Sequence, residues 1–296
     1  STGYTVNDGN SGNNYNVIRN NATGTITAAT LYLNATSQTR TYDATTASNG
    51  TVTNNALGSD TVTGTGQSFA SKNVLGANNS NITVNSTGYT VNDGNSGNNY
   101  NVIRNNATGT ITKADITNVV GVTVTDKVYD GNTSAAFNSS GANFTGKFAG
   151  DSLTLTGGTG GFANKNVGTN KTVNVTGAVL GGADAGNYQF TGNASTITGS
   201  ANITQANLYV NATSQTKVYD ATTASNASVT YSGLVGGETV TVNATQAYNS
   251  KNVLGTNNST LVANSSSLAV SDANWSTNYN VIRNNATGTI TQASIT

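Results

Sequence analysis

A tyrosine followed directly by an aspartate occurs three times in this chain, each time in similar surroundings. The three pairs are Tyr42–Asp43, Tyr129–Asp130 and Tyr219–Asp220. An aromatic ring beside a carboxylate can form a ligand site. The same pair can also form a structural corner that is made once in every domain. The two alternatives imply different functions, because only the first would place chemistry at these residues.

The residue that follows each aspartate favours the structural corner. It is alanine, glycine and alanine in turn, so glycine is not required there, which argues against a left-handed backbone at this position. The carboxylate itself should then hold the turn. In an Asx turn the carboxylate accepts a backbone N–H from two residues further on, here at Thr45, Asn132 and Thr222. We expect the tyrosine ring to cover the corner of a small core.

A Lys-Asn-Val motif also occurs three times. Its lysines and asparagines are Lys72–Asn73, Lys165–Asn166 and Lys251–Asn252. We expect each lysine to lie along apolar surface and to pair with the carboxylate of the Tyr-Asp pair. The alternative is an amide crosslink between the lysine and an Asn or Asp side chain. That reaction needs a buried carboxylic acid close by, and each repeat has few acids.

Two further features could bind a ligand. The loop "NDGNSGNN", residues 7–14, spaces its oxygen-bearing side chains like a calcium loop, but it holds too little negative charge for firm calcium binding. A turn is the simpler interpretation. Trp275 is the only tryptophan and could stack on a sugar ring, although a lone aromatic residue more often covers a local apolar patch. We predict no catalytic residue, no metal site and no cofactor.

The composition excludes several classes of function. The net charge is zero and only 8% of residues are charged, against roughly 25% in an ordinary soluble domain, so nucleic acid is not an expected partner. The chain has no His and no Cys, which leaves no side chain that normally titrates near neutral pH and no thiolate. No run approaches the roughly 20 apolar residues of a membrane helix. The absence of His and Cys argues against an enzyme.

Internal repeats organise the whole chain. Residues 1–27 recur without change at 86–112, and four tyrosines mark the same position in successive copies: Tyr15, Tyr100, Tyr188 and Tyr279. The Tyr-Asp, Lys-Asn-Val, Asn-Tyr and Ile-Thr marks keep one order. This order predicts the following segments: 1–27, the C-terminal part of a preceding repeat; 28–112, repeat 1; 113–204, repeat 2; 205–291, repeat 3; and 292–296, the start of a following repeat.

Apolar residues alternate with polar ones along many short stretches, which is typical of strands. The pattern places Leu208 with Val210, Val173 with Val175, and Val240 with Val242 on one face. Asn- and Gly-rich clusters separate the stretches and predict turns. We therefore expect an all-β chain of tandem small antiparallel domains, either Ig-like β-sandwiches or β-grasp-like sheets. A β-solenoid is the alternative, but no period of about 20–30 residues is visible within a repeat.

The four marks also resemble a known family. Val-Tyr-Asp-Gly at 128–131, Lys-Asn-Val-Gly at 165–168, Gly-Asn-Tyr at 186–188 and a closing Gly-x-Ile-Thr resemble the YDG and MBG-type repeats of giant bacterial surface proteins. Those proteins include filamentous-haemagglutinin-like adhesins exported by two-partner secretion. The resemblance implies an extracellular location at the bacterial cell surface, a stalk or fibre of tandem β-domains, and no catalytic residue.

The expected function is therefore structural. Short junctions between the predicted repeats leave little room for flexible linkers, so the domains should stack end to end and give the stalk length and stiffness. The expected partners are neighbouring repeats of the same chain. One alternative is a repeat module that binds host or matrix glycans, and another is a subunit of a self-assembling extracellular fibre, whose partners are identical chains.

Overall fold

The computed structural model describes residues 3–295 as almost entirely β-structure. Its helices are one α-helix of four residues, α1 (Trp275–Asn278), and one 3-10 helix of three residues, η1 (Ala185–Asn187). The all-β prediction is confirmed. Within residues 3–295 no helix has the length and apolar character that a membrane crossing requires.

Repeat 1 contains nine short strands in three sheets. The strands are β1 (Ala29–Asn34), β2 (Thr39–Thr41), β3 (Thr53–Asn54), β4 (Thr61–Thr63), β5 (Gln67–Phe69), β6 (Ser80–Val84), β7 (Thr90–Asn92), β8 (Tyr100–Asn105) and β9 (Ala107–Thr112). The strand orders are β3-β1-β8, β2-β9-β6-β5 and β4-β7. The first and last strands of the repeat are thus built into its two larger sheets.

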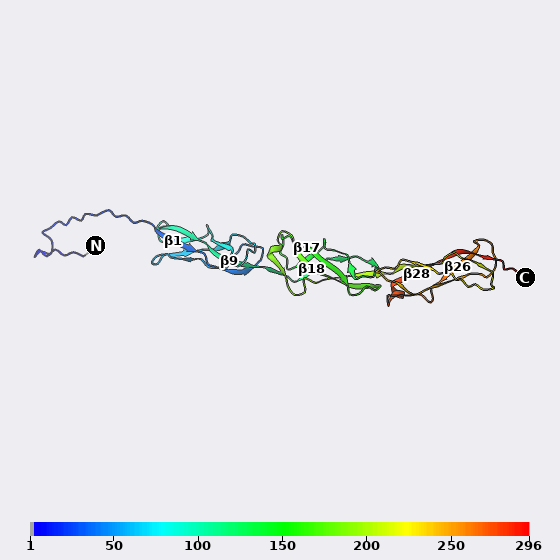
Figure 1. Cartoon of the computed structure of the whole chain (residues 1–296). Helices are drawn as coiled ribbons and strands as arrows, with labels where there is room; N and C mark the ends of the chain where they lie inside the picture. The colour runs from blue at the N-terminus through cyan, green and yellow to red at the C-terminus, as the bar shows by residue number, and fades with distance from the viewer. Residues whose placement is uncertain (1–2, 296) are drawn as a thin grey trace. The chain divides into compact units, whose positions relative to one another are not determined.

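Repeat 2 contains the longest strands of the chain. The strands are β10 (Ala114–Ile116), β11 (Asn118–Val120), β12 (Thr123–Val124), β13 (Lys127–Val128), β14 (Ser134–Ala135), β15 (Phe137–Asn138), β16 (Asn143–Thr145), β17 (Thr154–Phe162), β18 (Gly168–Gly181), β19 (Tyr188–Phe190) and β20 (Ile197–Thr204). Its main sheet has the order β13-β20-β18-β17-β14, and smaller pairs are β10-β19, β11-β16 and β12-β15. Figure 1 shows β17 and β18 side by side, as their antiparallel register requires.

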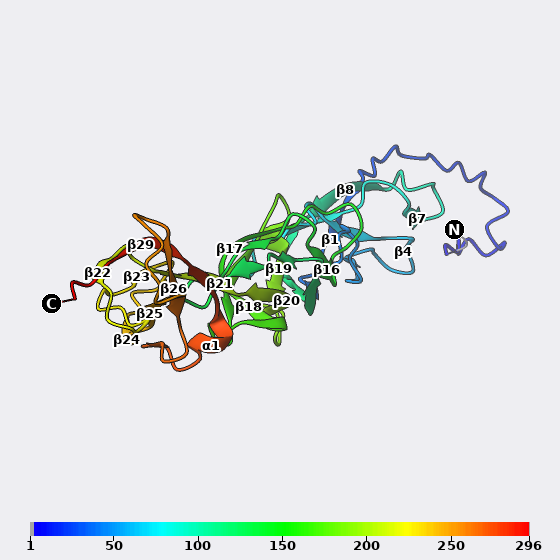
Figure 2. The same cartoon turned by 90° about the vertical axis from the view of Figure 1, so that its right-hand side faces the viewer.

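Repeat 3 returns to the plan of repeat 1. The strands are β21 (Ala206–Asn211), β22 (Thr216–Val218), β23 (Thr230–Ser232), β24 (Val240–Val242), β25 (Thr245–Tyr248), β26 (Ser259–Asn264), β27 (Ala269–Val270), β28 (Tyr279–Asn284) and β29 (Ala286–Thr291). The orders β23-β21-β28, β22-β29-β26-β25 and β24-β27 match the three sheets of repeat 1 strand for strand. Helix α1 leads directly into β28, as Figure 2 shows.

The sheets are mixed rather than purely antiparallel. An early strand of each repeat pairs in parallel with a late one: β1 with β8, β10 with β19, β13 with β20, β21 with β28 and β22 with β29. Parallel neighbours need a long crossover, which the intervening strands of the repeat supply. Every sheet in residues 3–295 is made from strands of one predicted repeat. The repeat boundaries themselves stay predictions.

The described residues form two compact units. The first consists of residues up to Thr39, Thr46–Ser71 and Leu75–Thr110, and the second of Arg40–Thr45, Lys72–Val74 and the chain from Ile111 onward. Each unit has its own buried core. The first core includes Leu31, Leu33 and Val84. The second core is larger and draws on both repeat 2 and repeat 3.

Strand alternation was predicted correctly in two of the three examples. Leu208 and Val210 are fully buried, as are Val173 and Val175. The third example is wrong, because Val242 is 50% exposed and Val240 is only partly buried. The pairing of β24 with β27 shifts register between these two residues, so an irregularity in the ladder turns one side chain away from the core.

Candidate functional site

The three Tyr-Asp pairs each form the Asx turn that the sequence predicts. The carboxylates accept backbone N–H bonds from two residues on: Thr45 to Asp43 at 2.9 Å, Asn132 to Asp130 at 3.1 Å, and Thr222 to Asp220 at 2.9 Å. A basic residue three positions earlier pairs with each carboxylate, namely Arg40, Lys127 or Lys217. The aspartate is therefore a structural residue of the corner.

The backbone after the aspartate differs from the expectation. Ala44 and Ala221 both have φ of 62°, and Gly131 has φ of 80°, so all three positions are left-handed. Alanine at two of them had argued against this conformation, and that inference is wrong. A left-handed L-residue costs about 1–2 kcal/mol, and the bonds to the neighbouring carboxylate offset this cost.

The tyrosines of the first two pairs reach an acid far along the chain. Tyr42 donates its hydroxyl to Asp151, and Tyr129 donates its hydroxyl to Glu238; the two residues lie 109 positions apart in both cases. Both tyrosines are 1% exposed. In each case the tyrosine belongs to one predicted repeat and the acid to the next. All four residues lie within the second compact unit.

Cluster 1 is built around the buried carboxylate of Asp151. Its other members are Tyr42, Lys72 and Tyr188. The two tyrosines donate their hydroxyls to Oδ2 at 2.7 Å each, and Lys72 Nζ lies 2.7 Å from Oδ1. The aspartate side chain is 1% exposed. Three donors therefore replace the water that this carboxylate loses on burial, which satisfies both of its oxygens.

Cluster 2 repeats this arrangement with a glutamate. Its members are Tyr129, Lys165, Glu238 and Tyr279. Tyr129 donates to Oε1, which also lies 2.8 Å from Lys165 Nζ, and Tyr279 donates to Oε2 at 2.7 Å. The two tyrosine rings meet edge to face with centroids 5.5 Å apart, against 5.4 Å for Tyr42 and Tyr188 in cluster 1. The same constellation therefore forms twice, although the acid differs in length.

A buried asparagine adds a second link beside each carboxylate. Asn187 Oδ1 accepts the backbone N–H of Val74 at 2.9 Å, and Asn278 Oδ1 accepts that of Val167 at 2.8 Å. Their amide nitrogens donate to Asn73 Oδ1 and Asn166 Oδ1 in turn. Asn73 with Val74, and Asn166 with Val167, belong to the Lys-Asn-Val motifs. These motifs thus supply a cation, an amide and a backbone donor to the following repeat.

The clusters hold their acids in the charged form. Burial opposes ionisation of Asp151, but Lys72 and the two tyrosine hydroxyls outweigh it and keep its pKa below the usual value. The pKa of Glu238 is lowered in the same way by Lys165, Tyr129 and Tyr279 against the effect of burial. The bond to Asp151 raises the pKa of Lys72. Lys72 and Lys165 therefore form ion pairs with these two acids.

The lysines nevertheless pair with other acids than expected. The predicted partner of Lys72, Lys165 and Lys251 was the Tyr-Asp carboxylate, and that prediction is wrong. Lys72 pairs with Asp151 and Lys165 with Glu238; each also lies near a second acid, Asp184 at 3.9 Å or Asp272 at 3.3 Å. The Tyr-Asp carboxylates pair instead with the basic residue three positions earlier, which is Arg40, Lys127 or Lys217.

Comparison with known proteins identifies the repeats that carry these corners. A family model described as the YDG domain matches residues 112–198 and again residues 204–289. The chain belongs to the YDG-domain family. The two matched segments contain the Tyr129–Asp130 and Tyr219–Asp220 corners and all four residues of cluster 2.

Among solved structures, the chain is similar to two fragments of Drosophila N-cadherin. The EC1-4 fragment aligns over 90% of this chain and 76% of its own, with 9% identity and a TM-score of 0.25. The EC1-3 fragment aligns over 91% of this chain and 100% of its own, with 6% identity and a TM-score of 0.22. No protein with a curated description matches the sequence.

The residues that mark the YDG repeats in the sequence differ in burial from one repeat to another. Tyr100, Tyr188 and Tyr279 are buried, whereas Tyr15 is 64% exposed. Tyr219 is 37% exposed, and Lys251 and Asn252 are also exposed. The third Tyr-Asp corner therefore makes its local turn without the buried tyrosine contact that the first two corners make.

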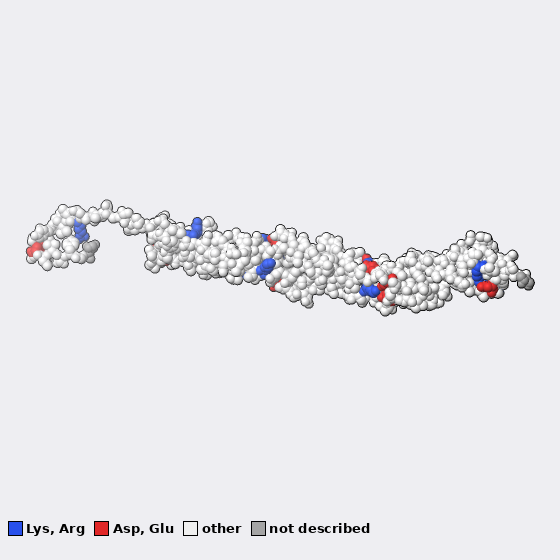
Figure 3. All heavy atoms as spheres, in the orientation of Figure 1, with Lys and Arg blue, Asp and Glu red and all other residues white. Residues whose placement is uncertain are grey.

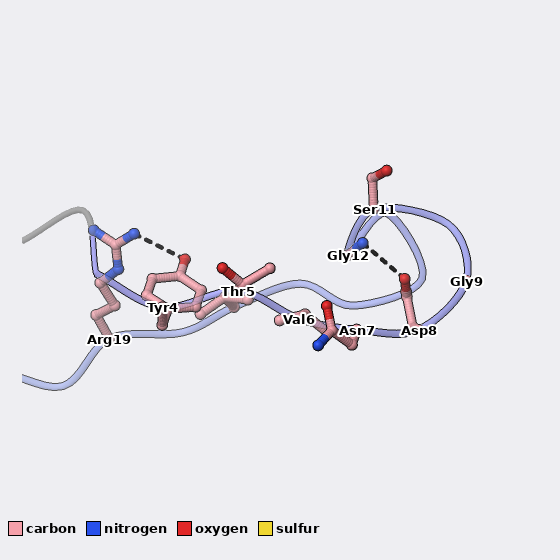
Figure 4. A pocket seen from close by; sticks show the side chains of 10 residues that line it. Tyr4, Thr5, Val6, Asn7, Asp8, Gly9, Ser11, Gly12 and Arg19 are labelled. Atoms are coloured by element: carbon pink, nitrogen blue, oxygen red, sulfur yellow. Dashed lines mark hydrogen bonds between the residues drawn. The ribbon is translucent and has the colours of Figure 1, made fainter.

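The loop of residues 7–14 and Trp275 both make contacts within the chain. Asp8 accepts backbone N–H bonds from Asn10 at 2.9 Å and Gly12 at 2.8 Å, so its loop is a turn; Figure 4 shows this loop and the bond from Arg19 to Tyr4 at its far end. Trp275 is partly buried against the core of the second unit. Within residues 3–295, no group of three potential metal-ligating side chains is present.

Sequence reasoning missed the two acids on which the clusters depend. Asp151 follows Phe-Ala-Gly, Glu238 follows Val-Gly-Gly, and Asp60 follows Leu-Gly-Ser. An apolar residue, two small residues and an acid therefore recur once in each repeat. This signal is present in the sequence, but it is hard to recognise because the acid is Asp in repeats 1 and 2 and Glu in repeat 3, and the residues before it also change.

Proposed function

We propose that this chain is a structural segment of an extracellular bacterial surface protein of the adhesin type, in which YDG-type repeats are joined by tyrosine–acid clusters. One observation carries the proposal: a tyrosine and a lysine of one repeat hold a buried acid of the next repeat, twice, and the tyrosine lies 109 residues before the acid in both cases. The chemistry of these residues binds repeat to repeat. It positions no substrate, and we propose no catalytic activity.

Composition supports this role. Only 8% of residues are charged, and Figure 3 shows Lys, Arg, Asp and Glu in a few small groups on a face that is otherwise uncharged. The charges of the clusters are paired within the chain, because each lysine forms an ion pair with an acid. A surface rich in Asn, Ser and Thr suits a hydrophilic spacer. The expected partners are therefore the neighbouring repeats.

Small-angle X-ray scattering tests the spacer role. The consecutive strands β8 and β9 together occupy residues 100–112. About 10–12 extended residues at roughly 3.3 Å per residue would make each repeat about 35–40 Å long, so three repeats in line would span about 105–120 Å. We expect a maximum dimension in this range. A value near about 60 Å would indicate a compact particle of ordinary domain dimensions and would contradict the spacer role.

Surface location needs a separate test on the native organism. An antibody raised against repeat 2 should label intact cells and should lose its target after brief protease treatment of those cells. Labelling only after permeabilisation would contradict the proposed location. The same cells treated with antibody against a cytoplasmic protein provide the control for membrane integrity.

A further inference from the structure

Repeat 3 places its first and last strands side by side and parallel. Six residues of β21 pair with β28, beginning with Ala206 opposite Tyr279, and three residues of β22 pair with β29. In both pairs the partner lies 73 residues later in the chain, so one register continues from the first pair into the second. We call residues 206–218 the entry arm of repeat 3 and residues 279–291 its exit arm.

The stretch between the two parallel pairs is also held. The N–H of Thr289 in the exit arm bonds to the carbonyl of Gln215 in the entry arm at 2.9 Å. The buried side chain of Gln246 accepts the N–H of Thr213 at 2.7 Å and donates to its carbonyl at 2.9 Å. The entry arm is therefore bonded to its neighbours between β21 and β22 as well as along them.

Side chains add further bonds between the arms. Asn280 Nδ2 donates to Asn207 Oδ1 at 3.1 Å, and Asn284 Nδ2 donates to Asn211 Oδ1 at 2.7 Å. Each of these bonds joins two residues that lie opposite each other in the ladder. The arms are thus connected through asparagine amides in addition to their backbones.

The exit arm of one repeat leads directly into the first strand of the next. Strand β20 ends at Thr204 and β21 begins at Ala206, so Gln205 alone separates them, and Lys113 alone separates β9 from β10. Repeats 1 and 2 also pair early strands in parallel with late ones, β1 with β8, β10 with β19 and β13 with β20. Tension along the chain would therefore pass through every repeat in series.

Parallel arms resist such tension in shear. Tension pulls the entry arm at Ala206 and the exit arm at Thr291, which lie at opposite ends of the parallel ladder. The arms can separate only by sliding along each other, so the bonds between them are loaded together. If both arms were pulled from the same end of the ladder, the bonds would be loaded one after another and the arms would peel apart.

We propose that these repeats bear tensile load, and that the parallel entry and exit arms are the element that carries it. The inference rests on the proposed spacer role and extends it, since a spacer that bears load must also stay folded when it is pulled. Resistance to forced unfolding is a kinetic property, because it depends on the rate of unfolding under load. Force, rather than denaturant, is therefore the appropriate measurement.

Single-molecule force spectroscopy with two attachment geometries tests the proposal. The chain has no cysteine, so two introduced cysteines provide the only thiol attachments. Gln205→Cys with Gln292→Cys loads the arms of repeat 3 in shear, whereas Gln205→Cys with Ser276→Cys pulls both arms from the same end; all three positions are exposed. At one loading rate, the shear pair should rupture at a force at least about twofold higher than the peeling pair.

The comparison contains its own controls. Gln205→Cys is common to both variants, so any effect of this substitution cancels. Urea denaturation without load should give both variants the same midpoint. The length released on rupture, about 3.3–3.6 Å for each residue between the attachments, identifies the event as the unfolding of repeat 3.

Repeat 2 provides a second, independent comparison if a variant of repeat 3 does not fold. Lys113→Cys with Gln205→Cys loads it in shear, and Lys113→Cys with Gly186→Cys pulls from one end of the β10–β19 pair. A Cβ at Gly186 meets no atom within 4 Å, so this site accepts a side chain. The shear pair should again rupture at the higher force.

Equal rupture forces in the two geometries would overturn the proposal, and so would a peeling pair that withstands more force than the shear pair. If either result were found while the maximum dimension from X-ray scattering stayed in the expected range, the repeats would be spacers that bear no load. The proposed spacer role would then stand without this inference.

Discussion

Residues 3–27 and 88–112 have the same sequence and different structures. In the second copy the residues form β7, β8 and β9; in the first copy residues 3–27 contain no strand. The Asp turn is present in both, since Asp8 and Asp93 each accept an N–H from two residues on, at 2.9 and 2.8 Å. The turn therefore depends only on its own residues, whereas the strands require partners.

The missing partners can be named. Strand β8 pairs along its full length with β1, and β9 pairs with β6, so both need earlier parts of the same repeat. Residues 3–27 have no such strands beside them within the described chain, and Ile26 is 100% exposed where Ile111 is 1% exposed. A short isolated hairpin buries too little apolar surface to be stable in water. In the same way, the buried tyrosines Tyr42 and Tyr129 need an acid from the next repeat.

The largest expected loss of stability comes from replacing a tyrosine that contacts the next repeat. Tyr129→Ala removes a buried ring and leaves Glu238 without one of its donors, so it should lower the free energy of unfolding by about 3–5 kcal/mol. Tyr219→Ala is the matched control in the same motif. It should cost less than about 1 kcal/mol, because the ring is 37% exposed. Urea denaturation measures both, and equal losses would show that the tyrosine acts through its local turn alone.

The two identical segments offer a second matched pair. Ile111→Ala empties a buried site in β9 and should cost about 2–5 kcal/mol. Ile26→Ala changes the same letter in the same sequence and should cost nothing measurable. Thermal melts monitored by circular dichroism distinguish them. A comparable loss from Ile26→Ala would mean that residues 3–27 are packed as in the second copy.

These comparisons show which features a sequence can predict. The all-β class and the Asx turns depend on short stretches of chain, and both were predicted correctly. The partners of Tyr42 and Lys72 could not be read in that way, because Asp151 lies 109 residues from Tyr42. The prediction instead paired each motif lysine with the Tyr-Asp carboxylate of its own repeat, where Arg40, Lys127 and Lys217 already lie.

The dependence of stability on pH distinguishes the clusters from the local turns. The pKa values of Asp151 and Glu238 are lowered in the folded chain, so their contribution is present at neutral pH and is lost as pH falls through the folded pKa. The pKa values of Lys72, Tyr188 and Tyr279 are raised, so their contribution is lost only in strong base. Stability should therefore be flat between about pH 5 and 9 and should fall below about pH 4.

Urea titrations at a series of pH values give this profile directly. The double variant Asp151→Asn, Glu238→Gln should be less stable at pH 7 and should lose less stability in acid, because its two buried amides no longer titrate. A fall of several kcal/mol between about pH 5 and 9 in the natural chain would contradict the assignment, since no group of the clusters is expected to titrate there.

The smallest expected effect concerns the left-handed residue of the corner, which is alanine in two repeats and glycine in one. Ala221→Gly should relieve the strain of φ at 62° and stabilise the chain by about 0.5–1 kcal/mol after the greater freedom of glycine in the unfolded state is counted. Gly131→Ala is the reverse change in a different setting. A Cβ there would lie 2.9 Å from the Cα of Gly236 in repeat 3, so it should cost about 1–3 kcal/mol. The left-handed backbone by itself accepts alanine, as Ala44 and Ala221 show, so the close approach of repeat 3 is the reason that the corner of repeat 2 needs glycine. Equal and opposite changes in the two variants would show that the local conformation alone decides, and that the approach of repeat 3 places no demand on Gly131.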